Sequence, residues 1–297
     1  MISALISLPF FDIFIGGLTL GLMYTLISLG FNLQYGVTRI FNVAHGEFLM
    51  LGSYLAYFCF TLYGLNIFYI LSIVGSLMFV LGVILQRVIF NRIVHRAKSG
   101  EELEFSSLLL SFGLSFIIQN AALFFWSADF RSYTYLNQPI YIAGQAFPLN
   151  RIVVAVISAI FCVILYCFLN FTYLGLAIKA VATEPVGARV VGINIAKVYA
   201  VSFGLGVFLS GIAGSLISML YTITPFMGGT YLFVAFLVTI LGGLGNFAGS
   251  SFSGILLGYV TYITMRLIHP SLTLVIYYAI FVLILIISPR GVFVRRD

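Results

Sequence analysis

Long apolar runs separated by short polar segments dominate the chain. Apolar stretches of roughly 17 to 25 residues, the length that crosses a bilayer as a helix, recur about nine times. The runs are continuous rather than alternating, which favours spanning helices over barrel strands. We place the spans near residues 12–36, 46–63, 66–87, 106–126, 151–170, 198–221, 230–247, 250–268 and 272–288. The pattern predicts an all-α fold, a polytopic membrane helix bundle with about nine transmembrane segments.

Glycines interrupt the first and seventh runs, so we expect one or two broken or re-entrant helices among the spans. The composition agrees with a membrane location, because 62% of the residues are hydrophobic and only 7% are charged, against about 25% charged residues in a soluble domain. No change in amino-acid composition along the chain marks a second domain. We therefore expect a single transmembrane domain over residues 1–297.

Basic residues mark the orientation of the bundle. They concentrate in the segments 87–104 and 171–197 and in the C-terminal tail, whereas no Lys or Arg precedes Arg39. By the positive-inside rule these three regions are cytoplasmic, which predicts the N-terminus outside and the C-terminus inside. The same rule accounts for the net charge of +6 without a nucleic-acid partner. The first apolar segment lacks a basic flank, so we expect it to remain as a span rather than act as a signal peptide.

Polar side chains lie within or beside apolar runs at two places. Polar groups at membrane depth are costly, and they often line a transport route. Each one alone is as consistent with a hydrogen bond between helices as with a ligand contact. The candidates for the translocation pathway are Asn32, Gln34, Asn42, His45 and Glu47 around the end of the first run, and Gln119 and Asn120 in the fourth.

The two longest loops differ in character. The external loop at about 127–150 carries several Tyr and two Pro, which suits an interfacial anchor or a docking surface. The cytoplasmic loop at about 171–197 is rich in small residues. Pro185 suits the first turn of a short helix that ends before Gly192, with Glu184 near its positive end. We expect this short helix to be presented to a partner.

Several kinds of chemistry are missing from the sequence. It contains no P-loop, no His-Glu-x-x-His metal motif and no nucleophile elbow. We therefore expect no catalytic residues, no metal and no cofactor in this chain. Glu47 is the one acid near membrane depth between the first and last spans, which disfavours a proton or sodium relay. Energy for transport has to come from another subunit.

Five sequence segments spread over nearly the whole chain carry a family resemblance. They are GLMYTLISLG at 21–30, FNVAHGEFLMLGSY at 41–54, GLAIKAVA at 175–182, ILGGLGN at 240–246 and SPRGVF at 288–293. In these segments and in their order the chain resembles the LivH-type permeases of branched-chain amino acid ABC importers.

The resemblance implies an importer subunit of the inner membrane that translocates branched-chain, hydrophobic amino acids. Its partners would be a second, LivM-type permease, two cytoplasmic ATPase subunits that bind ATP, an extracytoplasmic substrate-binding protein and membrane lipid. The short cytoplasmic helix would then seat in the ATPase. The implied coupling residues are Glu184, Pro185, Gly187, Ala188, Arg189 and Gly192.

The coupling segment departs from the family at one point. The family commonly reads Glu-Ala-Ala-x-x-x-Gly, whereas residues 186–192 here read VGARVVG, so the acidic contact is absent or comes from Glu184. Relatives within the family carry urea or short-chain amides, and no residue here separates those substrates from leucine. An ATP-independent channel is the alternative outside this class, and the permease pair is either a heteromer, as the resemblance favours, or a homodimer.

Overall fold

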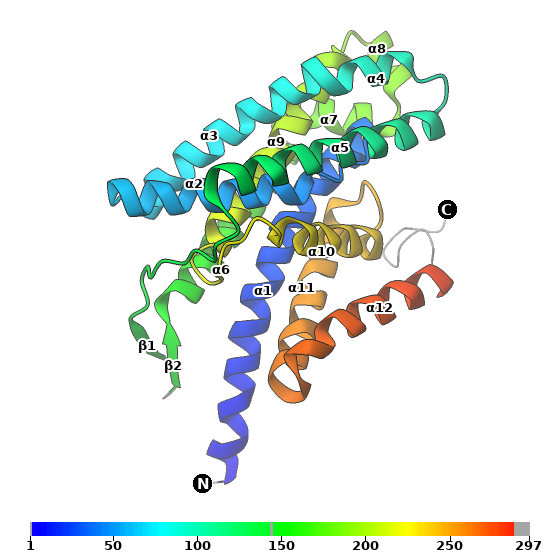
Figure 1. The fold of residues 1–297 in the computed structure, drawn as a ribbon. Helices are drawn as coiled ribbons and strands as arrows, with labels where there is room; N and C mark the ends of the chain where they lie inside the picture. The colour runs from blue at the N-terminus through cyan, green and yellow to red at the C-terminus, as the bar shows by residue number, and fades with distance from the viewer. Residues whose placement is uncertain (1, 143–144, 288–297) are drawn as a thin grey trace.

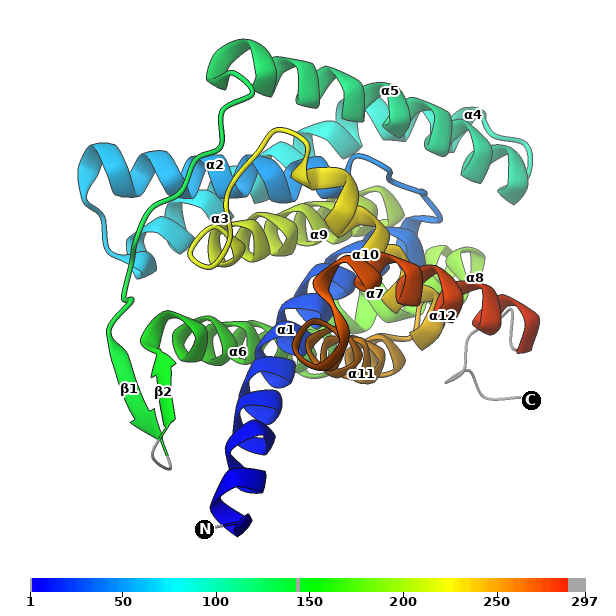
Figure 2. The same cartoon turned by 60° about the horizontal axis from the view of Figure 1, so that its bottom comes forward.

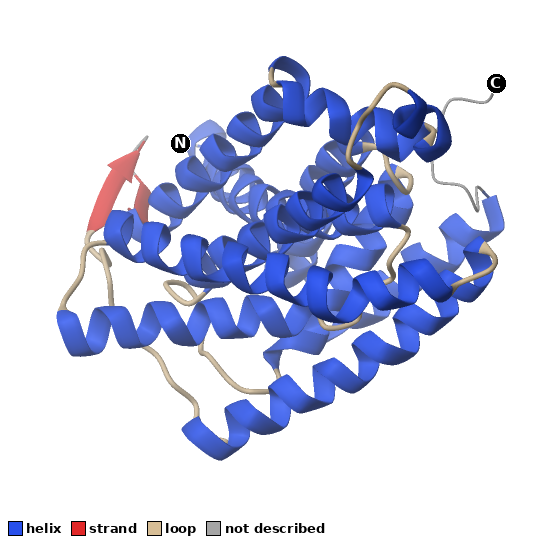
Figure 3. Ribbon diagram, turned by 90° about the horizontal axis from the view of Figure 1, so that it is seen from above, coloured by secondary structure: helices blue, strands red, loops and turns tan. Residues whose placement is uncertain are grey.

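The computed structural model describes residues 2–142 and 145–287 and is built almost entirely of helices (Figure 1). A two-stranded hairpin, β1 (Pro139–Ile142) with β2 (Gln145–Pro148), lies at one edge (Figure 3). Short π-helical segments extend α3 (Gln86–Phe90) and α11 (Thr264–Ile268), and a 3-10 turn (Pro270–Leu272) precedes α12. The α-helices are α1 (Ile2–Thr38), α2 (His45–Tyr63), α3 (Ile67–Leu85), α4 (Asn91–Arg96), α5 (Gly100–Trp126), α6 (Leu149–Phe171), α7 (Tyr173–Thr183), α8 (Pro185–Val190), α9 (Ile195–Ile217), α10 (Met227–Gly242), α11 (Phe247–Ile263) and α12 (Thr273–Ile287).

Six helices in the described part of the chain are long and apolar enough to cross a membrane. They cover Phe11–Thr38, Ile67–Arg96, Gly100–Trp126, Leu149–Phe171, Ile195–Ile217 and Phe247–Ile268. The molecule is thus a multi-pass helical membrane protein. Three further apolar helices are shorter, among them α10 with 16 residues. The total of nine crossings stays a prediction.

One expectation about the first span is wrong. The glycines at the start of the chain do not break it, because α1 is a continuous helix of 37 residues that runs through the middle of the bundle (Figures 1 and 2). Its glycines serve close packing instead. A Cβ on Gly21 would lie 2.7 Å from the Cα of Ile255 in α11, and one on Gly36 would lie 2.9 Å from Gly245. Small residues let helix backbones approach closely. Such packing stabilises helix association in a membrane, where the lipid provides no hydrophobic driving force between helices.

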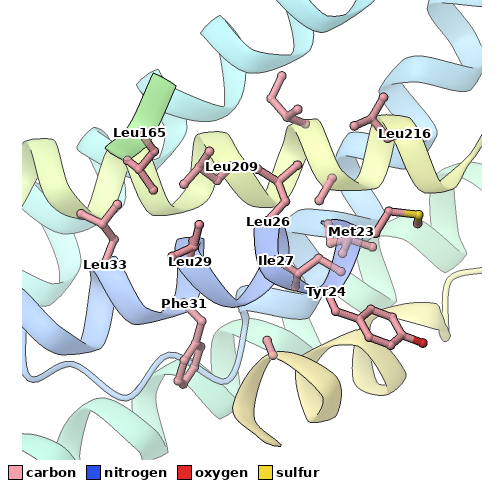
Figure 4. Close-up of a cluster of buried hydrophobic side chains, with 14 of the residues drawn as sticks. Met23, Tyr24, Leu26, Ile27, Leu29, Phe31, Leu33, Leu165, Leu209 and Leu216 are labelled. Atoms are coloured by element: carbon pink, nitrogen blue, oxygen red, sulfur yellow. The ribbon is translucent and has the colours of Figure 1, made fainter. Parts of the chain in front are cut away.

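The apolar core surrounds α1 and α9. Leu26 and Leu29 of α1 point towards Leu209 of α9, and all three are almost fully buried (Figure 4). Small residues on α9 face the neighbouring helices. Gly206 lies against Gln34 and the carbonyl of Gly30, and Gly214 lies against Leu49 and Ser53 of α2. α5 sits on the outside of the bundle, where it exposes Phe105, Leu109, Ile117 and Phe124.

The segment 127–150 forms a hairpin after an extended stretch. Arg131 pairs with Ile223 through two backbone hydrogen bonds of 3.0 and 2.7 Å, and Tyr133 lies 2.9 Å from the hydroxyl of Ser218. The loop is therefore held against the end of α9 rather than lying free. The hairpin and the N-terminal end of α1 lie towards one end of the molecule, and α4 and α8 towards the other (Figure 1).

Candidate functional site

The chain turns between α1 and α2, and most of the predicted pathway residues lie at this junction. α1 ends at Thr38, whose hydroxyl donates to the carbonyl of Gln34 at 2.6 Å and accepts from the backbone N–H of Ile40 at 3.3 Å. Arg39 then takes a left-handed conformation with φ of 55°, which is uncommon for a residue with a side chain. These features redirect the chain into α2 within six residues.

Five of the predicted residues meet at the junction, and all are buried. Asn32, Gln34, Asn42 and His45 are 0% exposed and Glu47 is 4% exposed. The amide of Asn32 donates to the hydroxyl of Ser250 at 2.8 Å and accepts from the backbone N–H of Gly245 at 2.7 Å. Asn32 therefore ties α1 both to the turn that joins α10 to α11 and to the first turn of α11.

The remaining amide and imidazole groups form hydrogen bonds as well. The Asn42 amide donates to Gln34 Oε1 at 2.8 Å, and its Oδ1 accepts from the backbone N–H of Ala44. His45 Nε2 lies 3.1 Å from the carbonyl of Ile27, and the carbonyl of His45 accepts from Ser210 of α9 at 2.9 Å. The junction thus fastens α1, α2 and α9 together through polar contacts that lipid cannot replace.

Glu47 faces the start of α10. A Cβ added to Gly228 in the first turn of α10 would lie 2.7 Å from the carboxyl atoms of Glu47, so the two residues are in close contact. Its Oε1 also accepts from Ser115 Oγ at 3.4 Å. The N-terminus of a helix carries partial positive charge that favours a carboxylate. Its other oxygen, Oε2, is buried without a hydrogen-bond partner among the described residues, so one hydrogen bond and the contact with Gly228 hold this acid inside the bundle.

Sequence reasoning missed a row of serines on α5 that completes the junction. Ser107 accepts from the backbone N–H of Phe41 at 3.0 Å, and Ser111 accepts from that of Val43 at 2.9 Å. Ser115, the next in the row, reaches Glu47. Hydroxyls spaced four residues apart on one helix face are a readable signal, because that spacing places them in line.

Gln119 and Asn120 do not join this cluster. Asn120 is exposed, and its amide donates back to the carbonyl of Phe116 in its own helix at 2.8 Å. Gln119 is partly exposed one turn beyond Ser115. A pathway role for these two residues stays a prediction. Among the described residues, no hydrogen bond joins either of them to Asn32 or Gln34.

Removing the Asn32 amide should destabilise the protein. Asn32→Ala leaves the N–H of Gly245 and the hydroxyl of Ser250 without this partner in a buried site. We expect a loss of about 2 kcal/mol of folding free energy, measured as a lower thermal midpoint of the purified protein. Ser202→Ala is the control, because the Ser202 hydroxyl is fully buried and has no hydrogen-bond partner among the described residues. Equal midpoints for the two variants would contradict the bracing role of Asn32.

The predicted short helix is confirmed as α8, and α7 precedes it. Glu184 caps α8, since its carboxylate accepts from the backbone N–H of Val186 at 3.2 Å, and Pro185 occupies the first turn. Ala188 is 4% exposed and anchors α8 to the core. Gly192 ends the segment at φ of 86°, in the left-handed region that favours glycine.

The outer face of α8 is apolar. Val186, Val190 and Val191 are 71%, 82% and 75% exposed. Arg189 lines a cleft of about 370 Å³ between α4, α8 and the start of α9, together with Asn91, His95 and Tyr199. An apolar ridge beside a polar and basic cleft is typical of a surface that binds another protein. A Cβ added to Gly187 would lie 3.3 Å from the Cγ of Glu184, an exposed side chain that can shift.

No group of three or more His, Cys, Asp or Glu side chains that could hold a metal ion exists among residues 2–142 and 145–287 as described. The three cysteines are free. The contacts at the junction are hydrogen bonds and close packing.

Comparison with known proteins decides the family. Residues 13–285 match the model of the family described as branched-chain amino acid transport system, permease component. This chain belongs to that family. No solved structure matches it.

Named relatives cover the chain almost from end to end. It is 26% identical over 294 residues to the high-affinity branched-chain amino acid transport system permease protein BraD of Pseudomonas aeruginosa, with 95% of each chain covered. It is also 26% identical to the LivH permease proteins of Salmonella typhimurium and Escherichia coli K12, covering 95% of this chain and 94% of theirs. The expected family resemblance is thereby confirmed.

Proposed function

We propose that this chain is the permease subunit of an ATP-driven importer that carries branched-chain amino acids across the inner membrane. The observation that carries the proposal is the family match over residues 13–285. The exposed apolar face of α8 supports the proposal, because a permease without its own ATP-binding motif needs a surface that binds an ATPase subunit. The chain is one transmembrane domain and catalyses no reaction itself.

In this proposal the end that carries α4 and α8 faces the cytoplasm, and the bundle crosses the membrane about nine times. Arg92, Arg96 and Arg189 lie on or beside the helices of that end. The N-terminus then lies outside and the C-terminus inside. The basic residues of the tail fall among residues 288–297, outside the described part of the chain, as does the last family segment.

A second, LivM-type permease would complete the pathway. Two cytoplasmic ATPase subunits would each bind one of the two permeases. α8 would enter a cleft of the ATPase, with Val186 and Val190 in contact and Glu184 supplying the acidic group. An extracytoplasmic binding protein would dock on the side of segment 127–150. ATP-driven closure then favours one of two arrangements of the bundle, which is alternating access.

The proposal separates from its alternatives by substrate and by energy source. Proteoliposomes that contain this chain, its sister permease, both ATPases and the binding protein should take up radiolabelled leucine only when ATP is supplied on the ATPase side. Urea and acetamide should not be taken up above the background. Uptake of urea in place of leucine would identify an amide permease, and uptake of leucine at the full rate without ATP would identify a channel.

A further inference from the structure

A cavity of about 390 Å³ opens at the end of the molecule that carries the hairpin. We call it the α6 cavity, because the first turn of α6 contributes two polar side chains, Asn150 and Arg151. Its other walls come from α1, the end of α9 and the π-helical segment after α11. The volume lies in the range of small-molecule sites, roughly 300–1,000 Å³. A π-helical segment in a wall is itself a feature found often at functional sites.

Charged groups in the cavity wall and just behind it form a connected chain with one cation in excess. Asp12 pairs with Arg266 at 3.1 Å and accepts from the Tyr262 hydroxyl at 2.9 Å. Arg151 donates to the same hydroxyl at 3.5 Å and has no carboxylate partner among the described residues. Two guanidinium groups therefore face one carboxylate.

An unused acceptor lies next to this excess cation. Asn150 is 9% exposed, its amide nitrogen donates to the carbonyl of Met219 at 3.3 Å, and its Oδ1 has no hydrogen-bond partner in the described structure. A buried acceptor without a donor costs free energy that a ligand N–H group can recover. Asn150 and Arg151 thus offer an acceptor and a cation side by side, while Leu20, Leu220 and Met265 supply apolar wall.

We infer that the α6 cavity binds the zwitterionic head of an amino acid, with Arg151 holding the carboxylate, Asn150 Oδ1 accepting from the ammonium group and the aliphatic side chain against Leu20 and Leu220. The inference rests on the proposed function and assigns the substrate's first contact with this subunit, at the outer face. A guanidinium binds a carboxylate through charge-assisted hydrogen bonds. Phosphatidylethanolamine also presents an ammonium group beside an anion, with a phosphodiester in place of the carboxylate, so the experiment separates the two sources.

The experiment measures equilibrium binding of radiolabelled leucine to the complex of both permeases and both ATPases, without the binding protein, in phosphatidylcholine nanodiscs. That lipid has no N–H group to donate to Asn150. Competition by leucinamide, which lacks the carboxylate, and by 4-methylpentanoate, which lacks the ammonium group, is measured in parallel. With the wild-type complex, each analogue should compete at least roughly tenfold more weakly than leucine.

Two variants assign the groups individually. Arg151→Gln should weaken leucine binding about tenfold and leave leucinamide unchanged, and Arg151→Lys should restore most of the loss. Asn150→Ala should remove the preference for leucine over 4-methylpentanoate and keep that over leucinamide. Lys98→Gln, which removes an exposed charge at the opposite end, is the control and should bind as the wild type does. A merely structural role would not change the two preferences separately.

Several results would overturn the inference. These are the absence of saturable leucine binding to the wild-type complex, unchanged analogue preferences in Arg151→Gln and Asn150→Ala, and loss of wild-type leucine binding when phosphatidylethanolamine replaces phosphatidylcholine. The last result would make the cavity a lipid headgroup site. ATP-driven leucine uptake by proteoliposomes is scored separately. Wild-type uptake with unaltered variants defeats this inference alone, whereas a wild-type complex that takes up no leucine defeats the proposed function.

Discussion

Replacing Gly258 with leucine is expected to keep this chain from reaching a stable fold. Gly258 of α11 lies directly against the backbone of Gly21 in α1, so that any Cβ at position 258 would overlap the Cα and N atoms of Gly21. One turn earlier, Gly254 meets the backbone of Thr25 in the same way. Backbone atoms cannot move aside as the tip of a side chain can. The loss of folding free energy should exceed about 3 kcal/mol, above the usual cost of overpacking.

The measurement is the monodisperse fraction of a fluorescent fusion after detergent extraction, followed by the thermal midpoint of what remains. Gly113→Leu is the matched control, because Gly113 also lies inside a helix, α5, and a Cβ there meets nothing within 4 Å. It should match the wild type in both readouts. Gly258→Ala should fall between the two, since it adds only the overlapping Cβ. A Gly258→Leu protein as stable as Gly113→Leu would refute close backbone contact between α1 and α11.

The spans could be predicted from the sequence because length and hydropathy alone determine whether a helix can cross a bilayer. The predicted span 106–126 lies within α5 (Gly100–Trp126), and 151–170 lies within α6 (Leu149–Phe171), and both helices are long and apolar enough to cross a membrane. The predicted span 46–63 falls on α2 (His45–Tyr63), which is not one of the six such helices in the described part of the chain. The prediction of a break in the first span was wrong, because a glycine looks the same in the local sequence whether it ends a helix or packs against a neighbouring helix. Only the position of α11 against α1 distinguishes the two cases.

The junction could be predicted in part. Five polar residues close in sequence were expected to act together, and all five are buried. Asn42 bonds Gln34, whereas Asn32, His45 and Glu47 each bond other partners, so their common role stays a prediction. The partner serines of α5 and the contact of Glu47 with Gly228 depend on tertiary packing, so local sequence did not reveal them. The α6 cavity depends on tertiary packing even more than the junction does. Asp12 and Arg266 are separated by most of the chain, and they are brought together only by the packing of α1 against α11.

Substituting aspartate for Val190 should stop ATP-driven uptake while leaving the permease folded. Val190 is 82% exposed on α8, so the change disturbs no core contact of this chain. If α8 seats in a cleft of the ATPase, the carboxylate would be buried there without a partner, and such burial is costly. We expect at least a tenfold loss of leucine uptake in proteoliposomes, together with weaker co-purification of the ATPase subunits.

Two neighbouring substitutions separate coupling from folding in this test. Val190→Ile keeps the surface apolar and should transport normally. Ala188→Asp places the same carboxylate two residues earlier, where the side chain is 4% exposed, and should lower the yield of folded protein as well as uptake. Normal uptake by Val190→Asp would show that the exposed valines do not contact an ATPase subunit. In that case α8 would be a surface turn, and the force from ATP hydrolysis would have to enter the bundle elsewhere, with the cleft beside Arg189 as the next surface to test.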